Sequence, residues 1–451
     1  MLKKIIAIIA SSVIAHQAQA ATPRYSTVVN ELYNFNHPYA AQASNELATK
    51  MSKMAVSPFS FYRGTAHLFY KDMTTLPTSS FTNTATNKVW LQGDMHLQNF
   101  GGLLDDAGNY IFDINDFDEG YFGSYVWDIR RMAVSILLAA KENGLNTTDR
   151  QQVVRDFIDA YLDQMAIFKG SSDELNFRLT TANTGEVVKD TIVAASNKTR
   201  SSFLSKYTSI TNSQRKFQNL SDLVAVPSAT YTAINNAMTS YVNSIASSKR
   251  YTSSFYTVKD IRQKLGSGVG SLGRLRYFVL IQGASSSTSD DVILEMKQQT
   301  NSAVAIAAPN LMPSSAYNNH QGYRMVRTAK AMMTNTDRLY GYTTVNATPY
   351  SLREKSPFQE DFDYTLLTNY DKFNTAVEYM GKVLARAHAI SDQDYDATLI
   401  TYSIDKQVSD VITSRASFKD EIINFALDYT TQVEYDWNSL KTAIQNGATL
   451  Y

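Results

Sequence analysis

The chain has 451 residues and no cysteine, and its 42 Lys and Arg residues balance its 42 Asp and Glu residues. The lack of cysteine excludes disulfides, thiolate nucleophiles and Cys-ligated metals. The neutral balance, without a long basic run, gives no electrostatic reason to expect a nucleic acid or an anionic membrane as partner. We therefore expect a small molecule or another protein as the partner, and the length favours two lobes.

The first twenty residues have the pattern of a secretory signal. Lys3 and Lys4 precede an apolar run over residues 5–15, and Ala18-Gln19-Ala20 forms a small-residue cleavage site. That run is too short to remain as a membrane-spanning helix, and no later run is long enough to do so. The pattern predicts an exported protein, periplasmic or secreted, with no permanent membrane span, whose mature chain begins near Ala21.

Residues 21–255 have the pattern of a mainly helical region that contains two short strands. In chain order we expect helices at 46–54 and 64–73, strands at 89–91 and 110–112 with a turn at 105–109 between them, and helices from Ile129 to Met165. Polar residues near 93–119 therefore lie on loops at strand ends. Residues 171–253, rich in Ser, Thr and Asn, predict weak helices and surface loops.

Residues 256–355 have the pattern of a small β-rich lobe. Four glycines between 266 and 273 precede strands at 277–281 and 292–296, then a helix at 321–333 and a strand at 350–354. From residue 356 to the end the pattern is helical again, and residues 376–390 carry a strong apolar stripe. We interpret residues 356–451 as helices that complete the large lobe.

The segment from Gly93 to Glu119 carries the residues most suited to chemistry. Asp94 and Asn99 are five positions apart, which is the Asp-x4-Asn spacing of kinase catalytic loops. Phosphoryl transfer needs a carboxylate to accept the proton of the attacking hydroxyl and oxygen ligands to hold magnesium against the phosphates. One strand later, Asp116-Phe117 stands where a second metal-binding aspartate is expected, and Trp127-Asp128-Ile129 follows.

These motifs resemble the Gly-Asp-x-His-x-x-Asn, Asp-Phe and Tyr/Trp-Asp-Leu series of aminoglycoside-phosphotransferase-like kinases. Together with Phe61-Tyr62-Arg63-Gly64, the segment also resembles the bacterial family DUF2252, which is grouped with the protein-kinase-like fold. The resemblance extends over most of the mature chain and includes the residues at 268–273, 294–297, 322–324 and 384–389. It implies an α+β, two-lobed kinase-like fold. Because the glycine-rich turn follows the catalytic loop, we infer a circularly permuted order.

The resemblance also implies roles for individual residues. It makes Asp94 the catalytic base, with His96 holding the loop and Arg63 pairing with the acidic loop or a phosphate. It implies that Mg²⁺ or Mn²⁺ is held by Asn99 and Asp116, with Asp113 and Asp118 as further candidate ligands. ATP or another nucleotide would contact Gly268, Gly270, Gly273 and Lys297. The acceptor, a small molecule or a protein, is not specified by these motifs.

The sequence departs from kinases in two places, and simpler interpretations stand beside each motif. Residues 299–353 contain no glutamate to pair with Lys297, and Asp118 replaces the glycine of Asp-Phe-Gly. The aspartates also fit ordinary turns, and the glycines fit a flexible hairpin. Because an exported protein meets little ATP, two alternatives remain open. One is a kinase-like binding protein without activity, and the other is a metal-dependent phosphohydrolase that uses Asp94, His96, Asp113 and Asp116.

Overall fold

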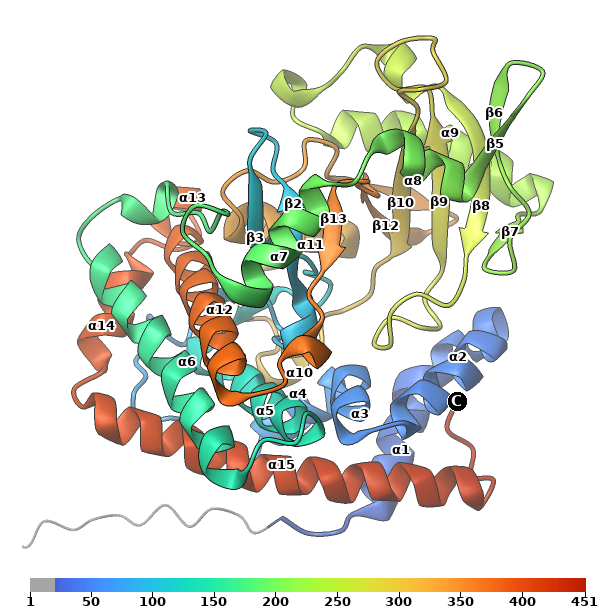
Figure 1. Cartoon of the computed structure of the whole chain (residues 1–451). Helices are drawn as coiled ribbons and strands as arrows, with labels where there is room; N and C mark the ends of the chain where they lie inside the picture. The colour runs from blue at the N-terminus through green and yellow to red at the C-terminus, as the bar shows by residue number, and fades with distance from the viewer. Residues whose placement is uncertain (1–20) are drawn as a thin grey trace, which may run out of the picture.

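The computed structural model describes residues 21–451, so the predicted signal segment at 1–20 lies outside the described residues. The fold mixes α-helices with four β-sheets (Figure 1). Most helices lie in one part of the molecule, a six-stranded sheet lies in the other, and strands β2, β3 and β13 lie between them. Within residues 21–451, no helix has the length and apolar character needed to cross a membrane.

The helices form where apolar residues recur at helical spacing and a polar residue caps the first turn. Asn146, Asn369 and Ser414 each accept a hydrogen bond from a backbone N–H in the first turn of α6, α12 and α15. The helices are α1 (Tyr25–Asn36), α2 (Ala40–Ala55), α3 (Pro58–Gly64), α4 (Ala66–Met73), α5 (Tyr125–Glu142), α6 (Thr147–Phe168), α7 (Glu186–Ser196), α8 (Arg200–Tyr207), α9 (Ser228–Ser244), α10 (Val304–Ala307), α11 (Gln321–Met332), α12 (Tyr370–Ile390), α13 (Gln393–Asp396), α14 (Ile404–Val411) and α15 (Arg415–Gln445).

The largest sheet is antiparallel, with the strand order β11-β12-β10-β9-β8-β7. Its strands are β7 (Leu223–Ala225), β8 (Val258–Lys264), β9 (Arg276–Ile281), β10 (Val292–Gln298), β11 (Gly341–Val345) and β12 (Thr348–Glu354). Helix α9 packs on one face, where apolar side chains of β9, β10 and β12 form a separate core with it. Both β7 and α9 precede residue 256. The part of the chain that builds this sheet therefore begins before the β-rich region that the sequence predicts at residues 256–355.

Three smaller sheets complete the fold. A three-stranded sheet has the order β13-β2-β3, and β1 pairs with β4 and β5 with β6. Their strands are β1 (Val89–Leu91), β2 (Phe100–Leu104), β3 (Tyr110–Ile114), β4 (Tyr121–Gly123), β5 (Thr208–Thr211), β6 (Gln214–Phe217) and β13 (Gln359–Asp361). Because β13 pairs with β2, the chain that leaves the large sheet lies beside the segment that contains Asp94.

The two ends of the described chain meet on the long helix α15. Arg24 donates hydrogen bonds to Asp436 at 2.7 Å and to Asp72 at 2.6 Å, and the Thr22 N–H donates to Gln432. Helices α1 to α6, α12 and α15 contribute to one large apolar core. Segments near both ends of the described chain therefore share a core with apolar residues of the segment at 93–119.

Candidate functional site

The loop at residues 93–99 is fixed by a buried aspartate in the first turn of α5. The Asp128 carboxylate accepts hydrogen bonds from the N–H groups of Gln92 at 2.8 Å and Gly93 at 3.0 Å. The Nε2 atom of His388 on α12 lies 3.3 Å from the same carboxylate. A side chain at Gly93 is excluded because its φ is +87° and a Cβ would lie 2.2 Å from the Glu119 carbonyl oxygen. The loop conformation is thus set by Asp128 of α5 and by the backbone at Glu119, with His388 of α12 next to Asp128.

Asp94 projects from this loop and is held by a fully buried arginine. The Nε atom of Arg131 on α5 donates to Asp94 Oδ1 at 2.7 Å, and Nε2 of His96 lies 3.9 Å from Oδ2. Burial raises the pKa of Asp94 to about 7, although Arg131 opposes this rise. Burial, with Arg63 and Arg131 nearby, lowers the pKa of His96. Asp94 is thus able to exchange a proton near neutral pH. His96 stays neutral and packs against Phe59.

Asn99 and Asp116 place side-chain oxygens next to this loop. The Asn99 Nδ2 group donates to the Asp94 carbonyl oxygen at 2.8 Å, so its Oδ1 is available to a ligand. The Asp116 side chain is 41% exposed, and its backbone carbonyl accepts a hydrogen bond from Gln92 Nε2. Burial and the neighbouring Asp118 raise the pKa of Asp116. Gln92 also accepts a hydrogen bond from the Asp94 N–H, so one side chain ties the two aspartates' backbones together.

These oxygens fit a magnesium or manganese ion that is bound together with a phosphate. Among residues 21–451, no three His, Cys, Asp or Glu side chains are grouped so that they alone could hold a metal ion. Magnesium usually keeps several waters and uses one or two carboxylates plus substrate phosphates. Asn99 Oδ1 and the Asp116 carboxylate are oxygen donors of this kind. The residues therefore fit the metal only when a ligand supplies the remaining oxygens.

Asp113, the third predicted aspartate, faces away from the site. It lies on β3 and forms a buried ion pair with Arg386 of α12. Asp118 instead faces the site, where it forms an ion pair with Lys297 and accepts a hydrogen bond from Gln299. Although burial acts in the opposite direction, Lys297 and Arg274 hold the pKa of Asp118 below its usual range. Asp118 is therefore the nearest carboxylate to Lys297, whose Nζ also lies 3.8 Å from Asp116 Oδ2, while Asp113 is paired with Arg386 outside the site.

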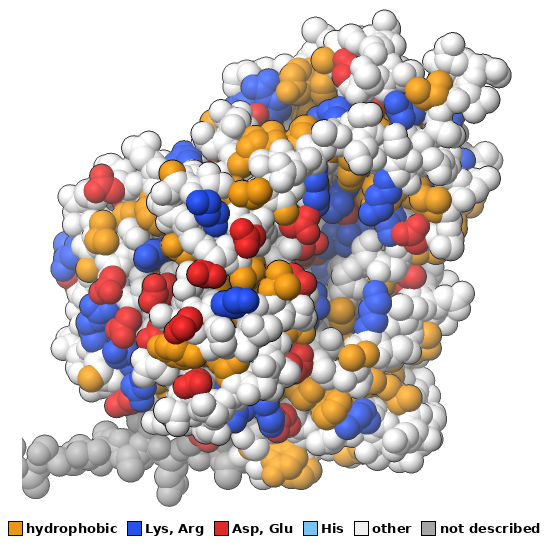
Figure 2. All heavy atoms as spheres, in the orientation of Figure 1, with side chains coloured by type: hydrophobic (Ala, Val, Ile, Leu, Met, Phe, Trp, Pro, Cys, Tyr) orange, Lys and Arg blue, Asp and Glu red, His pale blue; other side chains and the backbone are white. Residues whose placement is uncertain are grey.

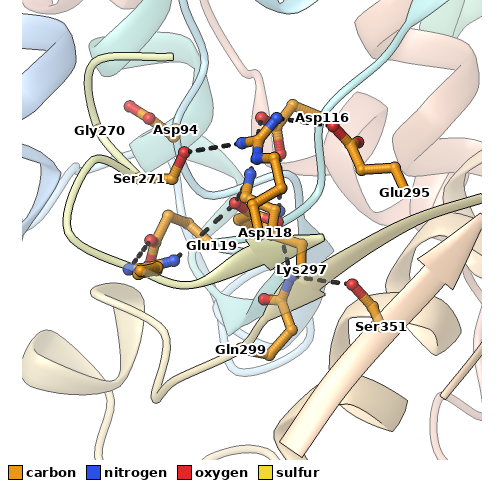
Figure 3. Close-up of polar contacts among 12 residues, drawn as sticks. Asp94, Asp116, Asp118, Glu119, Gly270, Ser271, Glu295, Lys297, Gln299 and Ser351 are labelled. Carbon is orange, nitrogen blue, oxygen red and sulfur yellow. Dashed lines mark hydrogen bonds and ion pairs between the residues drawn. The ribbon is translucent and has the colours of Figure 1, made fainter. Parts of the chain in front are cut away.

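The glycine-rich loop between β8 and β9 folds over the same site. Gly268 and Gly270 line a cavity of about 70 Å³ together with Asp94, Asn99 and Asp116. Figure 3 shows the loop with Gly270 and Ser271 close to Asp94 and Glu119, and Lys297 pointing toward Asp118. Gly273 is the exception, because it does not line this cavity. Its φ is +100°, and a Cβ there would lie 2.6 Å from Leu47 of α2, so this glycine serves packing.

The small cavity adjoins a larger one of about 440 Å³. Arg63, Asn99, Asp116, Asp118, Gly268 and Ser271 line both cavities, and Lys297 lines the larger one. Figure 2 shows Lys and Arg side chains gathered in a hollow on this face of the molecule. Nine of the eleven residues predicted for the site thus lie around one continuous space. Asp113 and Gly273 are the two that do not.

Several side chains at the site were not predicted as functional. Arg131, which is not part of any of the sequence motifs, holds Asp94. Glu119 pairs with Arg274 at 3.0 Å, and its other oxygen accepts a hydrogen bond from the Ala303 N–H. Lys50 of α2 is buried and donates to the Gly270 carbonyl at 3.1 Å. In the sequence, a functional role for Arg131 is indicated only by its position as a charged residue in a helix that is apolar on nearly every side.

Comparison with known proteins gives one match, to a family. The model of the family described as "Uncharacterized protein conserved in bacteria (DUF2252)" matches residues 42–443. Neither a curated protein nor a solved structure matches the chain significantly. The matched range includes every residue predicted for the site.

Proposed function

The chain belongs to the DUF2252 family, and we propose that it is a kinase-like phosphotransferase that takes a phosphoryl group from a metal-bound donor. One observation carries this proposal. A carboxylate with a pKa of about 7, an adjacent amide and carboxylate suited to magnesium, a glycine-rich loop and a buried lysine all line one space. They come from segments far apart in the sequence. Phosphoryl transfer requires these parts together.

In this proposal each side chain has a defined task. Asp94 accepts the proton of the acceptor hydroxyl, while Arg131 and His96 keep its carboxylate in place. Asn99 and Asp116 would hold Mg²⁺ or Mn²⁺, which when bound neutralises charge on the donor phosphates. Lys297, the N–H groups of the glycine loop and Arg63 bind the phosphates from the other side. The expectation from the sequence that the donor is ATP or another nucleotide stays a prediction.

The kinase-like, two-lobed and circularly permuted fold is part of the same proposal. The order β8, glycine loop, β9, β10 with its lysine, then α11, is the order expected for a kinase small lobe. Helix α12 follows it and supports the catalytic-loop region, because Arg386 binds Asp113 and His388 approaches Asp128. The contact of Thr22 with Gln432 brings the two ends of the described chain together, as a permuted order needs.

One of the two alternatives is weakened by the geometry. A phosphohydrolase built on Asp94, His96, Asp113 and Asp116 loses Asp113, since that carboxylate is committed to Arg386. It would also leave the lysine and the glycine loop without a task. The inactive binding protein uses the same cleft and differs only in turnover, so experiment has to separate it from the transferase.

Thermal melting of the mature protein tests the proposal. A ligand that binds the folded state raises the melting temperature. We expect ATP or another phosphate donor to do so with Mg²⁺ or Mn²⁺ present, and Asp116→Asn to abolish the metal-dependent part. Activity of a Lys297→Met variant separates the two enzyme hypotheses. A phosphotransferase should lose activity in this variant, whereas a phosphohydrolase should keep it. If no donor shifts the melting temperature and Asp94→Ala behaves like the wild type, the proposal fails.

A further inference from the structure

Part of one face of the six-stranded sheet is charged and forms a wall of the larger cavity. Arg276 on β9, Glu295 and Lys297 on β10, and Arg353 on β12 all line it. They are neighbours across the strands, because Lys297 is paired in register with Arg276 and Glu295 with Arg353. Arg276 donates to Glu295 at 2.7 Å and also to the Ser271 hydroxyl of the glycine loop. The sheet thus presents a connected set of ion pairs to the cavity.

Glu295 stands where a nucleotide-binding kinase has a small apolar residue. In the kinase motif Val-Ala-Ile-Lys, alanine lies two positions before the lysine and therefore on the same face of the strand. Here Leu294-Glu295-Met296-Lys297 puts a carboxylate there, only 5% exposed. Against the effect of burial, Arg276, Lys355, Arg353 and Lys297 hold the pKa of Glu295 well below its usual range. A permanent charge thus occupies the surface against which an aromatic base would pack.

The rest of the cavity is equally poor in apolar surface. Of the side chains that line it, only Phe278 and Met325 are purely apolar. Pockets for drug-sized ligands are usually lined mainly by apolar and aromatic groups, with few polar ones. A base placed here would lose water without gaining apolar contacts. The cavity, although its 440 Å³ is large enough for a small molecule, is built for a charged one.

The excess charge of the wall is positive. Its basic side chains are Arg63, Lys206, Lys264, Arg276, Lys297, Arg353 and Lys355, and its acidic ones are Asp116, Asp118, Asp222, Glu295 and Asp361. Within residues 21–451, Arg63, Lys206 and Lys355 form no ion pair. Burial lowers the pKa of Lys355, although the nearby carboxylates of Glu295 and Asp361 oppose this shift. These three cations are available to an anion.

We propose that this cleft recognises its donor through the phosphate chain alone and accepts inorganic polyphosphate. The inference rests on the proposed function, whose donor class it names. A linear chain of phosphates would extend from Asn99 and Asp116 along Lys297 toward Arg353 and Lys355 on the sheet. A charged wall suits every unit of such a chain equally. An exported protein could use it without a supply of ATP.

The reaction needs no further reagent. The oxygen of an acceptor hydroxyl forms a bond to the terminal phosphorus atom, and the bond from that phosphorus to the bridging oxygen breaks. The bridging oxygen keeps the electron pair and leaves with the polyphosphate, which is one phosphate shorter. The hydroxyl proton passes to Asp94. No atom is oxidised or reduced.

Titration calorimetry on the mature protein at about 150 mM salt, which screens exposed charges, tests this inference. The ligands are inorganic tripolyphosphate, ATP and adenosine, each with and without Mg²⁺. We expect tripolyphosphate to bind, ATP to bind within about tenfold of it, and adenosine not to bind. Tighter binding of ATP by more than about tenfold, or binding of adenosine alone, would overturn the inference while leaving the phosphotransferase intact. If neither phosphate compound binds, both proposals fail.

Two matched variants locate the binding. Lys355→Gln removes an unpaired cation of the cavity, and Lys189→Gln removes one from the exposed surface of α7. We expect Lys355→Gln to weaken tripolyphosphate binding about fivefold or more, and Lys189→Gln to leave it unchanged. Equal effects of the two variants would show that the anion binds by general charge attraction, and the inference would be wrong.

Discussion

The two faces of the six-stranded sheet differ in the charge that they carry. On the α9 side, Val279 and Leu294 pack into a dry core with Ile234. On the cavity side, Arg276 and Glu295 of the same two strands form ion pairs. A buried charge costs free energy that even a good partner repays only in part, whereas an apolar side chain gains free energy when buried. The α9 face is thus apolar, whereas the other face combines these ion pairs with an apolar cluster that contains Phe278, Leu280 and Ile293.

The largest expected effect lies in the cleft and concerns rate. Asp94→Asn removes the proton acceptor, so phosphoryl transfer should fall about 10²–10⁴-fold. Because the active form is the carboxylate and its pKa is about 7, the wild-type rate should rise as the pH increases through 7. Initial rates between pH 5.5 and 8.5 measure both effects. Asp190→Asn on the exposed surface of α7 is the control. An Asp94→Asn rate equal to that of this control would contradict the assignment.

On the α9 face the largest effect should be on stability. Leu294 is fully buried in the central strand β10, and Leu294→Ala should lower the free energy of unfolding by about 2–5 kcal/mol. Urea unfolding followed by circular dichroism measures it. The affinity for a phosphate donor should stay the same once the variant is folded. If the affinity changes as much as the stability, the two faces are not functionally distinct.

Replacement of Lys50 should have an intermediate effect on the free energy of unfolding, and this effect should depend on pH. Burial lowers the pKa of this lysine to about 7, against an ordinary value of 10.5 in the unfolded chain. Between these values the unfolded chain binds the additional proton, so stability should rise with pH, by up to about 1.4 kcal/mol per unit. Below pH 7 both states are protonated and the contribution stays constant. Lys50→Met should remove this rise, as unfolding measured from pH 6 to 10 would show; an unchanged slope would contradict it.

Lys355 should give the smallest change in stability. It lies in the cleft without an ion pair in the described chain, so Lys355→Met leaves no carboxylate unpaired. The free energy of unfolding should change by less than about 0.5 kcal/mol or increase slightly. A loss as large as that of Leu294→Ala would show that the charged face supports the fold as well.

Much of the fold and of the site could be predicted because local patterns determine them. The expected strands and helices are present, with ends that differ by no more than six residues from those predicted: strands at 89–91, 277–281 and 292–296 and helices at 321–333 and 376–390. The spacing of Asp94 and Asn99 correctly placed both in one loop. These features depend on neighbours in the sequence, which periodicity and motif spacing describe directly.

The rest depends on contacts between distant residues. The short strand β7 pairs with β8, which lies more than thirty residues later in the sequence. The three residues of β7 do not indicate this partner. Asp113 and Asp116 are three positions apart, yet one is bound by Arg386 of a C-terminal helix and the other faces the cavity. Likewise Asp118 became the partner of Lys297 only through packing of the sheet on the loop. Such pairings follow from tertiary structure and not from composition.

Hydrogen exchange of the mature protein tests most directly whether the loop at 93–99 and the glycine loop form one donor site, as proposed. The exchange of residues 94–99 and 266–275 would be compared with no ligand, with Mg²⁺, with tripolyphosphate, and with both. We predict that both segments exchange more slowly only when the metal and the phosphate chain are present together. Protection of one segment alone, or of neither, would contradict the account.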